Sequence, residues 1–243
     1  MSKLLISLGA ATALLAATAT LAVPVIVDDA GGTAVQFRFG DENSATSTVD
    51  IDLPTDFSPT VTGGEFKSTI NGNSGLFTFC LELEENLFSG GAGQDYTPVQ
   101  VGGGGEAHFT TPTQRTRLDS LYANHYAAAS TDATGQSAAA FQLLLWEIVY
   151  EGAGALDLLG GTFALGVGGD ATARATAISW GSTLDANPAL SGLTFFELQN
   201  AGWQDLLYAS RDGRIPPADV PEPGSLALLG LGALAFARLR KRG

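Results

Sequence analysis

Alternating apolar and polar residues predict strands in the first part of the chain. Residues 33–39 (TAVQFRF) place three apolar side chains on one side, as a half-buried strand does. Residues 47–52 form a second short candidate. Residues 58–70 hold one or two further strands, interrupted at Gly63-Gly64.

The longest β-prone run is residues 76–84 (LFTFCLELE), which follow a strong turn signal at 71–75. One face of this strand carries Phe77, Phe79, Leu81 and Leu83. Cys80 is expected in the middle of the strand, on the other and more polar face. Another strand pair is expected at 96–101 and 107–110, across a run of glycines.

The hydrophobic period then changes to that of helices. Thr111 is a capping residue before the first predicted helix, whose apolar positions recur at helical spacing. Residues 136–151 (QSAAAFQLLLWEIVYE) predict a buried helix with Ser137 as its N-cap and Gly152 at its end. Residues 170–185 predict a third helix, rich in small residues.

Further strands are expected at residues 162–167, 193–198 and 203–208. Strands, then helices, then strands predict an α+β fold: β-sandwich or barrel-like strands with an inserted helical segment, in a single domain. An N-terminal signal peptide and a C-terminal sorting helix are expected to flank this domain.

The N-terminal segment predicts export. Lys3 precedes an uncharged apolar run, and small residues stand before two cleavage positions, after Ala19 or after Ala22. This pattern is typical of a secretory signal peptide, assigned to residues 1–22, so signal peptidase is an expected processing partner.

The C-terminal segment combines three features. Pro221-Glu222-Pro223 is rigid and extended, because proline fixes φ and restricts the residue before it. The uncharged run 225–237 is well short of the roughly 20 residues that a spanning helix needs. A basic cluster follows, made of Arg238, Arg240, Lys241 and Arg242.

This arrangement resembles the PEP-CTERM sorting signal of Gram-negative exosortase systems. The resemblance implies transient insertion in the inner membrane, removal of the tail by exosortase, and delivery to the cell surface or outside the cell. An ordinary C-terminal membrane anchor is the alternative. The expected organisation is a signal peptide (1–22), an ectodomain (23–210), a linker (211–219) and the sorting signal (220–243).

The net charge of the exported part limits the kinds of partner that it can bind. All 25 acidic residues lie between residues 23 and 223, but only seven of the 12 basic residues do, so the net charge there is −18 instead of −13. Such a surface repels nucleic acid and anionic membranes. No nucleic-acid partner is therefore expected.

The single cysteine of an exported chain cannot form an internal disulfide. Phe79-Cys80-Leu81 on a strand and Phe141-Gln142 with Leu145-Trp146 on a helix resemble the thioester domain of bacterial surface adhesins. The resemblance implies a bond between the Cys80 sulfur and the Gln142 side-chain carbonyl. Phe79, Phe141 and Trp146 would shield this bond from water.

A thioester is a stored acyl electrophile that reacts once, so the expected activity is covalent attachment to an amine-bearing surface or matrix molecule, and not enzymatic catalysis. The alternative is a non-reactive, acidic matrix or biofilm protein in which Cys80 is a buried core thiol. An intermolecular disulfide at Cys80 is a further alternative.

No metal site or cofactor is expected. His108 and His125 are the only two histidines and lack a metal-ligand spacing, and no nucleophile elbow or phosphate-binding loop is present in the sequence.

Overall fold

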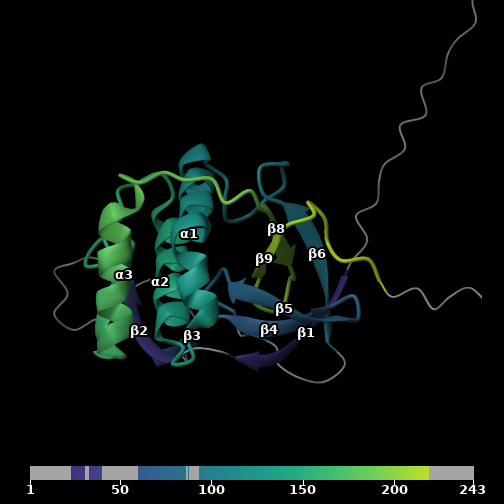
Figure 1. The fold of residues 1–243 in the computed structure, drawn as a ribbon, viewed down its shortest axis with the longest axis horizontal. Helices are drawn as coiled ribbons and strands as arrows, with labels where there is room; N and C mark the ends of the chain where they lie inside the picture. Colours follow the sequence, from purple (N-terminus) through teal and green to yellow (C-terminus); the bar gives the residue numbers. More distant parts are fainter. Residues whose placement is uncertain (1–22, 31–32, 40–59, 86, 88–92, 219–243) are drawn as a thin grey trace, which may run out of the picture.

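The strands form a closed antiparallel barrel packed beside three helices (Figure 1). The computed structural model describes residues 23–30, 33–39, 60–85, 87 and 93–218. In spatial order the barrel strands are β1 (Val23–Ala30), β4 (Phe66–Ile70), β5 (Asn73–Cys80), β9 (Leu206–Ser210), β8 (Thr194–Gln199) and β6 (Gln94–Gln100).

A second sheet has the order β3 (Thr60–Gly63), β2 (Thr33–Phe39) and β7 (Phe163–Gly169). The helices are α1 (Pro112–Thr131), α2 (Gln136–Glu151) and α3 (Ala171–Leu184). Figure 1 shows α1 and α2 between α3 and the barrel. This arrangement confirms the predicted α+β class, with barrel-like strands and an inserted helical segment.

Helix α2 is the centre of the core. Its residues from Ala138 to Ile148 are all buried, because α1, α3, β3 and β7 surround it. A helix that is apolar around most of its circumference is stable only when it is covered on several sides. The side chains of α2 therefore reach toward both the barrel and the second sheet.

The helix starts follow ordinary capping chemistry. Thr111 and Gln114 form the predicted capping box at α1, and Asp170 accepts hydrogen bonds from two backbone N–H groups of α3. The prediction of Ser137 as the N-cap of α2 is wrong. The N-cap is Gly135, which has φ 73°, and the Asp132 carboxylate accepts from Ser137 N at 2.8 Å.

Two strand predictions are corrected by buried polar contacts. β5 ends at Cys80 and does not continue to residue 84, because the N–H and C=O of Cys80 bond to the Gln142 side chain and not to a strand on that side. Residues 107–110 do not form a strand. The buried Glu197 carboxylate accepts hydrogen bonds from the N–H groups of residues 107, 108 and 109 at 2.7–3.1 Å, so these donors are unavailable to a strand neighbour.

β1 closes the barrel by pairing with β4 on one side and β6 on the other. No sequence pattern singled out this strand. The predicted strand at 47–52, the signal peptide and the sorting tail lie outside the described residues. Within the part of the chain that the structure describes, no helix is both long and apolar enough to cross a membrane.

The predicted linker packs against the barrel. Asn71, in the turn between β4 and β5, donates a side-chain hydrogen bond to the carbonyl of Pro216. Asn73, the first residue of β5, donates one to the carbonyl of Pro217, and both bonds are 2.8 Å long. Residues up to Pro217 are therefore held on the barrel, and the chain leaves the domain beside this turn.

Candidate functional site: a buried cysteine and glutamine

Cys80 is the last residue of β5, at a point where one neighbouring strand is missing. On one side Cys80 pairs with Leu206 of β9. On the other side β4 begins only at Phe66, whose partner is Thr78, so the ladder stops two residues before Cys80. The N–H and C=O of Cys80 on that side need another partner, because the residue is buried.

Gln142 of α2 supplies that partner. Its Oε1 accepts from Cys80 N at 2.9 Å, and its Nε2 donates to Cys80 O at 2.8 Å. Both residues are inaccessible to solvent, with 2% of Cys80 and 0% of Gln142 exposed. Two residues 62 positions apart in the sequence are thus held side by side by a pair of buried hydrogen bonds.

The aromatic residues predicted near this pair divide into two groups. Phe79 and Phe141 contact each other with ring centroids 4.6 Å apart, and Tyr122 of α1 packs edge-on against both. Trp146, one helical turn beyond Gln142, lies against Phe163 of β7, with centroids 6.3 Å apart.

The face of β5 that carries Cys80 is not the polar face that the sequence predicted. Thr78 and Cys80 point into the barrel, where Ser68 and Thr78 share a buried hydrogen bond of 2.9 Å. Side chains alternate along a strand, so Phe79 faces the helices instead. Phe77, on that same outer face, is 42% exposed because the helices do not extend over it.

Burial also decides the chemistry of the thiol. Desolvation, and next the nearby Glu82 carboxylate, raise the pKa of Cys80 well above its ordinary value, so the thiol stays protonated at neutral pH. A sulfur this deeply buried cannot reach a second chain while the domain is folded. The folded structure therefore disfavours an intermolecular disulfide.

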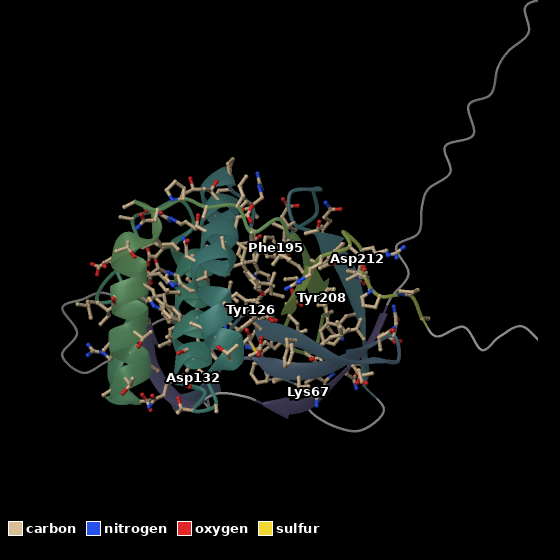
Figure 2. All side chains as sticks on the ribbon, in the orientation of Figure 1. Lys67, Tyr126, Asp132, Phe195, Tyr208 and Asp212 are labelled. Atoms are coloured by element: carbon tan, nitrogen blue, oxygen red, sulfur yellow. The ribbon has the colours of Figure 1, made fainter. Side chains whose placement is uncertain are left out.

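A groove of about 660 Å³ opens beside the aromatic cluster. Tyr122, Tyr126 and Tyr208 line it together with residues of the β5 start and the linker. In Figure 2, Tyr126 and Tyr208 lie at the boundary between helices and barrel. Tyr122 and Tyr126 stack on each other at 5.1 Å, so they connect the groove with the Phe79–Phe141 contact.

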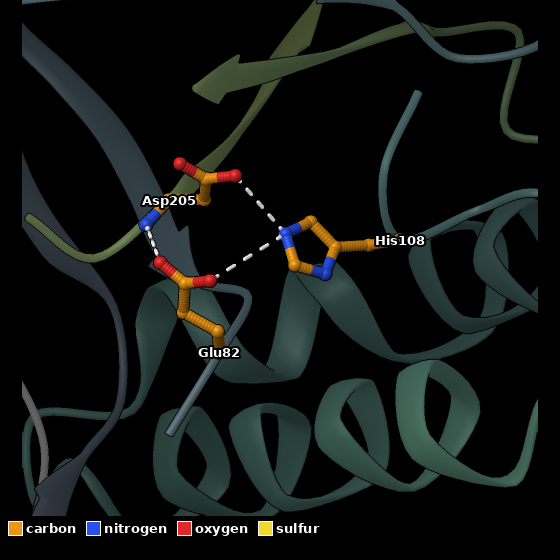
Figure 3. A group of neighbouring side chains, drawn as sticks. All are labelled: Glu82, His108 and Asp205. Carbon is orange, nitrogen blue, oxygen red and sulfur yellow. Dashed lines mark hydrogen bonds and ion pairs between the residues drawn. The ribbon is translucent and has the colours of Figure 1, made fainter. Parts of the chain in front are cut away.

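A second polar group, which the sequence did not predict, lies next to this site (Figure 3). His108 Nε2 is 3.1 Å from Asp205 Oδ2 and 4.0 Å from Glu82 Oε2. The three residues come from the segment just after β5, the segment before α1 and the segment before β9. Their spacing in the sequence carries no signal, because only the barrel closure brings these segments together.

The charges in this group influence one another. Burial is the main cause that raises the pKa of Glu82, to about 7, and the charge of Asp205 acts in the same direction. The hydrogen bond from the Asp205 backbone N–H acts in the opposite direction. Burial lowers the pKa of His108, but the hydrogen bond to Asp205 and the surrounding carboxylates outweigh it, so the net shift is upward. By contrast, His125 stacks on Trp180 at 4.3 Å, away from this group.

The comparison with protein families concerns the C-terminal segment. Residues 219–242 match the PEP-CTERM protein-sorting motif. The match includes Pro221, Glu222, Pro223 and the basic cluster, which lie outside the described residues. The motif implies an exosortase-processed, secreted protein of a Gram-negative bacterium that reaches the cell surface or exterior by passing the membrane. No curated protein and no solved structure matches the chain.

Proposed function

We propose that the exported domain attaches covalently to amine-bearing molecules of the cell surface or extracellular matrix through a thioester between Cys80 and Gln142. The observation that carries this proposal is the pairing of the Gln142 carboxamide with the N–H and C=O of Cys80, both residues being buried. Export by the PEP-CTERM route delivers such a reagent to the place where partner amines are found.

The bond would form when the Cys80 sulfur attacks the Gln142 side-chain carbon. The C–S bond forms, the C–N bond breaks, and the thiol proton leaves with the amide nitrogen as ammonia. Cys80 N already donates to Gln142 Oε1 at 2.9 Å, and this hydrogen bond stabilises the negative charge that develops on that oxygen. Holding both groups on a strand end and a packed helix supplies a large effective concentration.

Attachment to a partner would break the thioester between Cys80 and Gln142. A partner amine attacks the Gln142 carbonyl carbon, an amide bond forms, and Cys80 is released as a free thiol. Water is the competing nucleophile, and burial of both residues slows that hydrolysis. The groove lined by Tyr122, Tyr126 and Tyr208 offers an approach from the surface to the aromatic residues that cover Phe79 and Phe141.

A second candidate function rests on the same contact. Gln142 completes the hydrogen bonding of a strand end that β4 does not reach, which by itself is sufficient reason for a buried amide there. In that case Cys80 is a core thiol, and the domain is a non-reactive acidic matrix protein.

Intact mass distinguishes the two functions. We expect the exported protein to be lighter than its calculated, processed chain by one ammonia. Methylamine treatment should add one methylamine at Gln142, which leaves the protein heavier than the calculated chain by one methylene group. Cys80→Ala and Gln142→Ala should abolish both effects. Gln114→Ala, which removes a buried amide of α1 outside the pair, is the matched control and should keep both. A full mass with a thiol that titrates after unfolding would establish the non-reactive function.

A further inference from the structure

The group formed by Glu82, His108 and Asp205 is arranged as a set of metal ligands. Each residue offers one ligand atom, and the three atoms lie within 4.8 Å of one another. Ligands of a zinc-like ion lie about 2.0–2.2 Å from it, so neighbouring ligand atoms are about 3–3.5 Å apart. The separations are 3.1 and 4.0 Å from His108 Nε2 and no more than 4.8 Å between the two carboxylate oxygens, so the three atoms move closer together when they bind one ion.

The orientation of each carboxylate is fixed by its second oxygen. Glu82 Oε1 accepts from Asp205 N at 2.7 Å, and Asp205 Oδ1 accepts from Asn200 N, also at 2.7 Å. Glu82 Oε2 and Asp205 Oδ2 are thereby turned toward His108 (Figure 3). Such outer hydrogen bonds are what hold the ligands of protein metal sites in place.

His108 is equally well fixed through its backbone. Its N–H donates to Glu197 Oε1 at 3.1 Å, and its carbonyl accepts from Gln114 Nε2 at 2.8 Å. The three side chains remain partly accessible, with exposed fractions of 13% for His108, 18% for Glu82 and 10% for Asp205. An ion can therefore enter from solvent and keep water in its open positions.

We propose that Glu82, His108 and Asp205 bind one divalent transition-metal ion of the zinc type. A neutral imidazole and two carboxylates carry two negative charges, which a divalent ion balances. One nitrogen ligand favours zinc-like ions over calcium or magnesium, which prefer all-oxygen sites. The ion joins the segment just after β5 to the segments before α1 and before β9. Its binding therefore stabilises the barrel independently of any reaction at Cys80.

The test uses the exported protein, freed of metal with EDTA and titrated with zinc chloride by calorimetry. We expect one zinc per chain and a melting temperature raised by about 5–10 °C when free zinc is a hundred times the dissociation constant. The near-isosteric variants Glu82→Gln and Asp205→Asn should weaken binding at least tenfold. The matched control His125→Ala alters the only other histidine and should bind as the wild type does.

A second measurement needs no variant. With two histidines in the chain, zinc should shift the imidazole proton resonances of His108 at one equivalent and leave those of His125 in place. Binding below one equivalent, unchanged affinity in Glu82→Gln and Asp205→Asn, or a stronger affinity for calcium than for zinc would each overturn the proposal. Cys80→Ala should bind zinc normally, which separates this site from the proposed thioester.

Discussion

Gln142 occupies the place of a missing strand neighbour beside Cys80. Its carboxamide forms two hydrogen bonds, of 2.9 and 2.8 Å, with the backbone of a residue whose ladder on that side ends two residues earlier. The same contact brings an amide carbon next to the only cysteine of the chain. The stability of the strand end and the proposed thioester therefore depend on the same side chain.

The contribution of Gln142 to stability can be measured in the non-covalent state. In a Cys80→Ala background, Gln142→Ala leaves a buried N–H and a buried C=O without their partner. We expect the free energy of unfolding to fall by about 2–4 kcal/mol, measured by urea denaturation. Gln142→Glu keeps the acceptor but loses the donor and buries a charge, so it should be no more stable than Gln142→Ala.

A loss below 0.5 kcal/mol in Gln142→Ala, on the order of a surface substitution, would contradict this structural role. Water entering the space left by the side chain would be the physical reason for such a result.

The buried side chain of Glu147 should make the stability of the folded domain depend on pH. This fully buried residue of α2 has one oxygen, Oε1, that accepts from Asp157 N and a second, Oε2, without a hydrogen-bond partner. Burial raises the pKa of Glu147 to about 8. The folded state therefore holds this proton more tightly than the unfolded state, and stability is lost as the pH rises from about 4.5 through 8.

Glu147→Gln replaces the protonated acid by a neutral side chain of the same shape. Relative to this variant, the wild type should lose about 3–4 kcal/mol of unfolding free energy between about pH 5 and 8. Urea denaturation of both proteins across this range tests the difference. Parallel pH curves for the two proteins would show that Glu147 is ionised in the folded state.

Loss of the sorting motif should prevent processing of the C-terminal tail. Replacing Pro221, Glu222 and Pro223 together by alanine should prevent removal of the tail, because the rigid extended motif that exosortase recognises is lost. We expect an unprocessed protein in the inner-membrane fraction, detected by intact mass and fractionation. Asn73→Ala, which removes the side-chain hydrogen bonds to Pro217, Ile70 and Asn71 and leaves the motif intact, should still be processed. Normal release of the triple variant would exclude the motif as the sorting signal.

Local patterns in the sequence were sufficient to predict most of the helices and strands. Helices α1 and α3 start at the residues that their capping side chains predict, because a cap is a contact within one turn. Strands β2, β3, β4, β7 and β8 follow their apolar patterns closely. Two of the errors occur at residues 107–110 and at the end of β5, where the Glu197 carboxylate and the Gln142 amide replace strand neighbours.

The sequence by itself determined the α+β class, the sorting motif and the two short segments around Cys80 and Gln142, because each depends on residues close together in the chain. Only the tertiary structure decided that Gln142 meets the backbone of Cys80 and that Glu82, His108 and Asp205 converge. Those contacts join residues 26 to 123 positions apart. Barrel closure and the packing of α2 fix them, and no local pattern encodes such long-range geometry.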